Sequence, residues 1–242
     1  MNLIKKGWLF DLDGTLLPLR VDEFIPRYVE SLCRYVAKVA EPHRFQKCLL
    51  AATASMIEDE EPDQTNEEVF WRHFGACLGT AATARVIPLV KEYYQYAYPQ
   101  LGEDYEANPS ARRVLETVLA RGGRLILATN PVFPQEAIEE RMRWADIHGL
   151  PFELVTSYEN MHSCKPRVEY YREILERLEL EARECIMVGN DIQEDVIPAH
   201  SLGMDTYLVN EMVINRSPEK MTVASPSGSL QELIPFWKGG KV

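Results

Sequence analysis

The sequence predicts an α/β fold in which a parallel β-sheet has helices on both faces and a separate helical region follows the first strand. Short apolar runs alternate with helical patterns over residues 109–237, an arrangement typical of βαβ units. A nearly continuous apolar run at Trp8–Leu12 is typical of a strand buried on both faces. Residues 21–101 show helical periodicity without a strand pattern, so we expect an all-helical insert there.

Within the insert, apolar residues such as Phe24 and Tyr28 recur at three- and four-residue spacings, as on the buried face of a helix. Pro42, the acidic segment 58–63 and Gly79 interrupt this pattern and divide it into about four helices. The expected domains are a core of residues 1–17 and 105–242 and a helical domain of residues 18–104.

The second half of the chain predicts the rest of the sheet and its covering helices. Further strands are expected at residues 125–128, 152–155, 185–188 and 206–209. Helices are expected around residues 114–119, from 134, and at 166–178, 192–202 and 230–237. The segment 215–229 is rich in Ser and Pro, so we expect an irregular connection there.

Composition limits the possible functions and location. The net charge is −11, which argues against a nucleic-acid partner, and no apolar run approaches the ~18 residues of a membrane span. The N-terminus lacks the long apolar region of a signal peptide, so we expect a cytoplasmic protein without a membrane partner. The five scattered cysteines predict buried free thiols and no disulfide framework.

The first chemically suggestive cluster, Asp11-Leu12-Asp13-Gly14-Thr15, follows the first strand. Carboxylates two residues apart at a strand end are expected to point the same way. A turn would explain Asp13 and Gly14 but not Asp11, because an uncompensated charge at the end of a buried strand is costly. Two adjacent carboxylates need a cation or a proton. A hard cation such as Mg²⁺ suits oxygen ligands with no His or Cys nearby.

The second cluster, Thr129-Asn130-Pro131, follows the strand at 125–128. A hydroxyl and an amide at this position could donate to a phosphoryl oxygen. Either residue could equally cap the following helix. This cluster taken alone leaves both interpretations open.

The third cluster is Lys165-Pro166. Proline favours the first turn of a helix, which would place Lys165 at the positive end of the helix expected at 166–178. A cation is unfavourable there by ~0.3–1 kcal/mol. The cost favours a functional lysine, which could neutralise an anionic substrate and hold Asp11.

The fourth cluster, residues 189–195, follows the strand at 185–188. Asp191 and Asp195 are four residues apart, so on a first helical turn they face the same way. Acidic residues near a helix N-terminus are also stabilised by its dipole. By itself the cluster therefore does not decide between a structural and a functional role.

Together the four clusters resemble the haloacid dehalogenase-like hydrolase superfamily. Its motifs are DxDGT, a Thr or Ser after a strand, a Lys often followed by Pro, and GDxxxD or GNDxxxD. All four occur here in that order and at the expected strand ends. The resemblance implies a Rossmann-like core, a helical cap formed by the insert, and the phosphatase branch of the superfamily.

The resemblance also implies an aspartyl-phosphate mechanism. Asp11 would be the nucleophile, and Asp13 would first protonate the leaving oxygen and then accept a proton from water. Thr129, Asn130 and Lys165 would bind the phosphoryl oxygens of a small phosphorylated metabolite.

The cofactor implied by the resemblance is Mg²⁺. Its ligands would be Asp11, the carbonyl of Asp13, and Asp191. Asp195 would support the metal indirectly, by contacting these ligands or through a water molecule.

Two other functions stay open at the level of sequence. A phosphosugar mutase of the same superfamily also keeps Asp13, and a non-catalytic protein that binds a phosphorylated ligand could use the same fold. The identity of the substrate and the oligomeric state are not encoded in any recognisable motif. Tyr94 and Tyr98, four residues apart in the insert, could face a substrate, although packing between cap helices is the simpler expectation.

Overall fold

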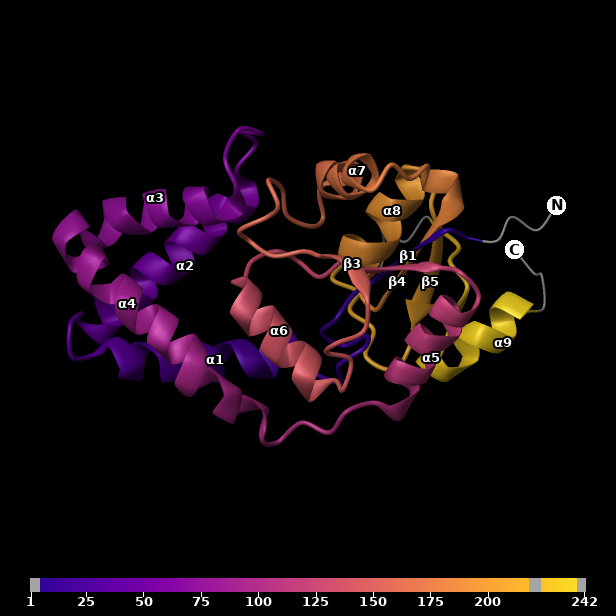
Figure 1. Ribbon diagram of the computed structural model, residues 1–242. Coiled ribbons are helices and arrows are strands. Elements are labelled where there is room, and N and C mark those ends of the chain that lie inside the picture. The colour runs from indigo at the N-terminus through magenta and orange to yellow at the C-terminus, as the bar shows by residue number, and fades with distance from the viewer. Residues whose placement is uncertain (1–4, 218–222, 239–242) are drawn as a thin grey trace.

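A single parallel sheet organises the chain. The computed structural model describes residues 5–217 and 223–238, and within them six strands lie in the order β3-β2-β1-β4-β5-β6 (Figure 1). Strand β1 is therefore an interior strand, between β2 and β4. The strands are β1 (Gly7–Phe10), β2 (Arg124–Leu127), β3 (Phe152–Val155), β4 (Cys185–Gly189), β5 (Asp205–Val209) and β6 (Ser227–Gly228).

The register of the central strands brings their carboxyl ends to one edge. Phe10, the last residue of β1, pairs with Leu127 of β2 and with Val188 of β4. All these pairings are parallel, so the residues that follow each strand emerge side by side. In open parallel sheets this edge is where ligands bind.

Alternate residues of β1 pack into separate cores on the two faces of the sheet, as the two-residue period of a strand requires. Trp8 and Phe10 belong to a core that continues into the helical insert, whereas Leu9 belongs to a second core. Helices α5 (Pro109–Ala120), α6 (Gln135–Trp144) and α9 (Leu233–Lys238) contribute to the first core. Helices α7 (Val168–Arg177) and α8 (Ile197–Ser201) cover the other face (Figure 1).

Four helices form the insert, which lies beside the core (Figure 1). They are α1 (Val21–Val36), α2 (Pro42–Glu58), α3 (Asn66–Leu78) and α4 (Thr80–Tyr96). A capping box between Thr65 and Glu68 satisfies backbone N–H groups that would otherwise lack partners at the start of α3. The helices fit a cap placed between the first and second strands, while the exact domain boundaries stay predictions.

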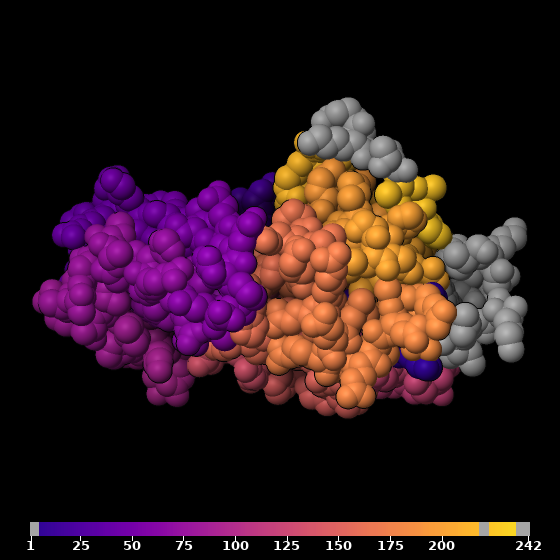
Figure 2. Space-filling view, turned by 90° about the horizontal axis from the view of Figure 1, so that it is seen from above, coloured from indigo at the N-terminus to yellow at the C-terminus, as the bar shows by residue number. Residues whose placement is uncertain are grey.

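The start of α3 docks the cap against the core. The backbone N–H groups of Asn66 and Glu67 donate to the carbonyls of Met161 and Tyr158, each at 2.8 Å. In the space-filling view the purple cap touches the orange segment that follows β3 (Figure 2). The docked segment leads directly to Lys165, so the position of the cap is linked to that of the candidate site.

The expected fold class is confirmed, with three local differences. Helix α7 begins at Val168 rather than at Pro166, so Lys165 does not sit at a helix start. The expected helix at 192–202 is divided into a π-helical turn, Ile192–Val196, and α8. A short strand, β6, lies in the segment that was expected to be irregular, because residues 227–228 pair with β5.

The expectation of free thiols is wrong for two of the five cysteines. Cys48 and Cys77 form a disulfide between α2 and α3, because the packing of these helices places their Cα atoms 5.5 Å apart. The other three cysteines are free and buried: Cys33, Cys164 and Cys185. Disulfides persist mainly in oxidising compartments, so this bridge counts against the cytoplasmic expectation, which stays a prediction.

None of the helices in residues 5–217 and 223–238 is long and apolar enough to span a membrane.

Candidate active site

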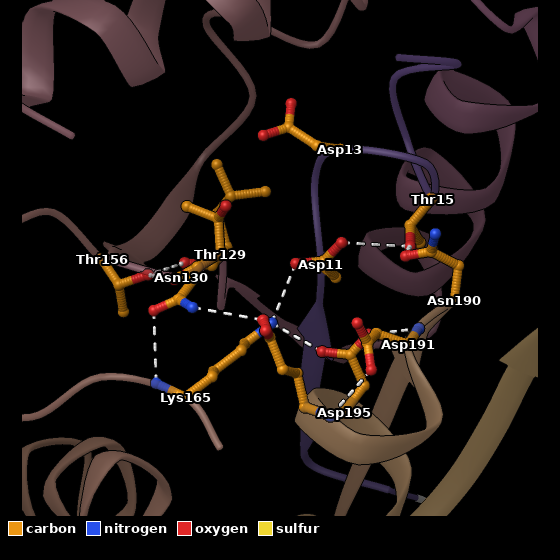
Figure 3. A network of polar contacts seen from close by, with 12 residues as sticks. Asp11, Asp13, Thr15, Thr129, Asn130, Thr156, Lys165, Asn190, Asp191 and Asp195 are labelled. Carbon is orange, nitrogen blue, oxygen red and sulfur yellow. Dashed lines mark hydrogen bonds and ion pairs between the residues drawn. The ribbon is translucent and has the colours of Figure 1, made fainter. Parts of the chain in front are cut away.

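Polar residues from four segments meet at the carboxyl edge of the sheet (Figure 3). The segments follow β1, β2 and β4 or precede α7, which is where the sequence placed its four clusters. Figure 3 shows Lys165 pointing toward Asp11 and Asp195. The structure therefore brings the expected clusters to one place.

Lys165 links the first and fourth clusters. Its Nζ lies 2.8 Å from Asp11 Oδ1 and 2.6 Å from Asp195 Oδ1, and the lysine side chain is only 1% exposed. Burial disfavours the charged ammonium, but the two carboxylates outweigh that effect and raise the pKa of Lys165 well above its usual value. Lys165 is thus a fixed buried cation beside Asp11.

Asp195 is held from two sides. Besides the contact with Lys165, its Oδ2 accepts the backbone N–H of Asp191 at 3.0 Å. Burial raises the pKa of Asp195, while the charge of Lys165 acts in the opposite direction. Gly189 makes room for this carboxylate, since a Cβ there would lie 2.2 Å from Asp195 Oδ2.

The second oxygen of Asp11 faces the loop that follows β1. The Thr15 hydroxyl lies 3.3 Å from Asp11 Oδ2 and 3.1 Å from the Asn190 side-chain oxygen. Gly14 has a φ of 82°, which glycine adopts readily, and a Cβ there would meet the Asn190 amide. Asp11 is consequently oriented by contacts on both oxygens.

Asp13 does not point with Asp11 as the two-residue spacing predicts. Strand β1 ends at Phe10, so the strand period no longer applies at these residues, and Figure 3 shows Asp13 apart from the carboxylates around Lys165. Asp13 Oδ2 accepts a hydrogen bond from Arg141 Nη1 of α6. Burial raises the pKa of Asp13 to about 6, and the Arg141 guanidinium opposes that rise.

In the second cluster, Thr129 is buried and Asn130 is half-buried, and both make hydrogen bonds within the protein. The Thr129 carbonyl accepts hydrogen bonds from the hydroxyls of Thr156, at 2.7 Å, and Tyr170, at 2.9 Å. The Asn130 side-chain oxygen accepts the Lys165 backbone N–H at 3.2 Å, and its amide donates to Glu194 at 3.2 Å. Asn130 therefore positions the Lys165 segment, and substrate contacts by Thr129 and Asn130 stay predictions.

Asp191 already has a cationic partner. Its Oδ1 accepts the backbone N–H groups of Gln193 and Glu194, at 2.9 and 3.0 Å. Its Oδ2 lies 2.5 Å from Arg216 Nη1, on the connection that follows β5. The Asp191 side chain is 7% exposed and that of Arg216 is 53% exposed, so the guanidinium approaches the site from its surface.

The donors at this edge suit a hard cation. No group of three or more His, Cys, Asp or Glu side chains capable of holding a metal occurs in the described part of the chain. The expected Mg²⁺ set needs only two such side chains, Asp11 and Asp191, together with the Asp13 carbonyl. Both carboxylates are largely buried, and Asp191 pairs with the positively charged guanidinium of Arg216. The donor chemistry is thus compatible with Mg²⁺.

Arg141 and Arg216 join the site without having been singled out from the sequence. A signal for Arg141 existed, because it occupies the apolar face of α6 with Ala137, Ile138 and Met142, all of them buried. A charged residue on such a face is unusual unless it has a partner. Arg216 offered no comparable signal, because an exposed arginine in a connection is ordinary.

Comparison with known proteins places this site in a family. A sequence model described as haloacid dehalogenase-like hydrolase matches residues 8–209, from the first strand to the end of β5. The chain belongs to the haloacid dehalogenase-like hydrolase family. For this hydrolase, the match includes all four clusters and the helical insert between the first two.

Two curated relatives cover parts of this hydrolase. A glyceraldehyde 3-phosphate phosphatase of Methanothermobacter thermautotrophicus is 26% identical over 133 residues, which are 52% of this chain and 58% of the relative. A ribulose-1,5-bisphosphate 5-phosphatase of Halopiger xanaduensis is 30% identical over 107 residues, 44% of this chain and 43% of the relative. The chain thus spans about half the length of the curated relatives it matches.

Solved structures show that the fold is shared over nearly the whole hydrolase. The crystal structure of a predicted phosphoglycolate phosphatase from Haemophilus somnus aligns with 98% of this chain and 99% of its own, with a TM-score of 0.60. The sequence identity is 16%. At that identity the similarity establishes the fold and not the reaction.

Proposed function

We propose that the protein is a Mg²⁺-dependent phosphomonoesterase that hydrolyses a small phosphorylated metabolite through an aspartyl-phosphate. The observation that carries the proposal is the placement of Asp11 at the carboxyl edge of the sheet, oriented by the buried Lys165 at 2.8 Å, with Asp13 two residues further on. The names of the two curated relatives, both phosphatases, support the same chemistry.

In the first step, an Asp11 carboxylate oxygen attacks phosphorus and a new P–O bond forms. The ester P–O bond breaks, and the departing oxygen takes a proton from Asp13, leaving as an alcohol. Lys165, aided by Thr129 and Asn130, stabilises the charge on the phosphoryl oxygens.

In the second step, water attacks the phosphorus of the aspartyl-phosphate. Asp13, now ionised, accepts the proton of that water. The bond between phosphorus and Asp11 breaks, which releases inorganic phosphate and restores the nucleophile. Asp13 therefore ends the cycle in the protonated form in which it began.

Asp11, the Asp13 carbonyl and Asp191 are the residues that would hold Mg²⁺, with Asp195 supporting them through the backbone of Asp191. When bound, the cation supplies charge neutralisation and orientation of the phosphoryl group. Asp195 also positions Lys165 at 2.6 Å, so it acts on both the cation and the lysine.

The cap, residues 18–104, would close over the core of residues 1–17 and 105–242. Contacts of Asn66 with the Met161 backbone represent the docked arrangement, which would exclude water from the site. The expected partner is a small-molecule phosphate ester. The net charge of −11 disfavours nucleic acid.

The test is phosphate release from a panel of phosphorylated metabolites, with Mg²⁺ and with EDTA. Asp11→Asn should abolish release while keeping the melting temperature near that of the wild type, because the amide retains the shape of the carboxylate. Asp63→Asn, an exposed acid of the cap, is the matched control and should keep full activity.

Near-normal activity of Asp11→Asn would refute the nucleophile, and metal-independent release would refute the cofactor. Interconversion of sugar phosphates without net phosphate release would identify a mutase instead. Binding of a phosphorylated ligand with neither reaction would identify a non-catalytic role.

A further inference from the structure

Three polar atoms without partners are buried where the cap meets the core. Asp13 Oδ1, Arg141 Nη2 and the Tyr98 hydroxyl are each fully covered and make no hydrogen bond with any residue that the structure describes. Buried polar groups are nearly always hydrogen-bonded, because leaving them unpaired is costly. A group of such atoms beside a candidate acid therefore indicates a place for a ligand.

The Arg141 guanidinium is fixed by several contacts, but its nitrogen Nη2 makes no hydrogen bond within the described residues. Its Nη1 donates to Asp13, its Nε donates to the Ala137 carbonyl at 3.3 Å, and its guanidinium carbon lies 4.3 Å from the centre of the Phe133 ring. The side chain is 1% exposed. With these contacts fixing the guanidinium plane, the direction of the unused Nη2 is fixed as well.

Tyr98 approaches the same place from the cap side. It lies in the turn after α4, its ring stacks on Trp144 of α6 with centroids 5.4 Å apart, and it is fully buried. Asp13 and Arg141 are close enough for their charges to act on the pKa of Tyr98, which burial raises. The phenol can therefore donate a hydrogen bond but stays neutral.

We propose that Arg141 and Tyr98 bind an oxygen acceptor on the leaving group of the substrate, next to the ester oxygen that Asp13 protonates. This inference rests on the proposed phosphatase function and narrows its substrate class. The preferred esters carry an oxygen, from a hydroxyl or a carboxylate, on the carbon beside the ester carbon. An alkyl group at that position would leave both donors buried and unpaired.

Three esters of similar size test the proposal. Propyl phosphate has a methyl group where 2-hydroxyethyl phosphate has a hydroxyl and phosphoglycolate has a carboxylate oxygen. In the wild-type protein, at least one of the two oxygen-bearing esters should exceed propyl phosphate by about 10-fold to 100-fold in kcat/KM. The better of the two identifies the acceptor as a hydroxyl or a carboxylate.

Tyr98→Phe is the decisive variant, because it removes only an unpartnered hydroxyl and keeps the ring packed on Trp144. It should fold normally and lower kcat/KM for the preferred ester by about 10-fold, with propyl phosphate unaffected. Tyr35→Phe is the matched control, since its hydroxyl bonds Glu92 on the cap surface, and it should change neither rate. Arg141→Lys should reduce the same preference, but it also alters the support of Asp13.

Equal kcat/KM for the three esters, or an equal loss for all of them in Tyr98→Phe, would overturn the inference and leave the phosphatase function intact. Calorimetric titration of the same esters into Asp11→Asn measures their binding without turnover and so tests the inference independently. Selective binding without hydrolysis in the wild type would retain the acceptor site and refute the phosphatase, whereas unselective binding would refute the site.

Discussion

A single lysine ammonium compensates two buried carboxylates at the centre of this site. Lys165 is 1% exposed and contacts Asp11 and Asp195, which are themselves 12% and 1% exposed at the side chain. A buried ion pair adds little stability over a packed apolar pair, but removal of one partner leaves an uncompensated charge. The lysine is therefore expected to serve the fold as well as the reaction.

Lys165→Met should lower the free energy of unfolding by about 3–5 kcal/mol and abolish phosphate release. Adding Asp195→Asn should restore part of the stability, because one of the two unpaired charges is gone, but none of the activity. Denaturant unfolding and a phosphate assay measure the two effects. Unchanged stability in the single variant would show that the buried charges are solvated by other means.

How well a site residue could be predicted depended on whether it lies in a short motif beside a regular element. Asp11, Asp191 and Lys165 follow or precede regular elements in short motifs, and the structure brings them together. Arg141 belongs to no such motif, so its contact with Asp13, 128 positions away, could not be predicted from sequence. The apolar face that Arg141 shares with Ala137 and Ile138 was a signal of its burial but did not indicate its partner.

At the scale of elements, the turn after β4 depends on a glycine. Gly189→Ala would place a Cβ 2.2 Å from Asp195 Oδ2 and force the carboxylate away from Lys165. We expect a loss of about 1–3 kcal/mol in the free energy of unfolding together with most of the activity. Gly75→Ala, inside α3, meets nothing closer than 3.9 Å and should be neutral or stabilising in the same denaturant titration.

In the proposed function, Arg216, on the connection between β5 and β6, competes with Mg²⁺ for Asp191. Under that proposal, Arg216 must leave Asp191 before that carboxylate can bind Mg²⁺. Arg216→Gln should therefore tighten Mg²⁺ binding by about 2-fold to 5-fold, a modest effect because the arginine is half exposed. Arg216→Lys keeps the charge and serves as the control. Calorimetric Mg²⁺ titration without substrate measures the change, and weaker binding in Arg216→Gln would contradict it.

The strands were more predictable than the ends of the helices. Interior strands of a parallel sheet are buried on both faces, so each appeared as a short apolar run. The start of α7 was misplaced because proline at 166 favours a first helical turn. Instead, Lys165 and Pro166 lie in a separate turn, in which the Arg167 N–H donates to the Cys164 carbonyl at 3.1 Å, and the helix starts after Arg167. Strand β6 has two residues, too few for any period to show.

At the scale of the whole molecule, the Cys48–Cys77 disulfide ties the cap together. The bridge closes a loop of 29 residues, and in the chain-entropy account a loop of that length contributes about 3.6 kcal/mol. Reducing agent should therefore lower the melting temperature of the wild type. A Cys48→Ser/Cys77→Ser double variant should melt at the lower temperature with or without reductant. Identical melting of the oxidised and reduced wild type would show that the bridge adds no stability.

The interior position of β1 has a consequence for how the chain is synthesised. Strand β1 leaves the ribosome well before its neighbours β2 and β4, which are encoded more than a hundred residues downstream. Pairing between such distant strands is non-local and slow. The cap helices, with mostly local contacts, can form in the interval. Throughout that interval the apolar strand has no partner, so we expect nascent chains to be most prone to aggregation before β4 has emerged.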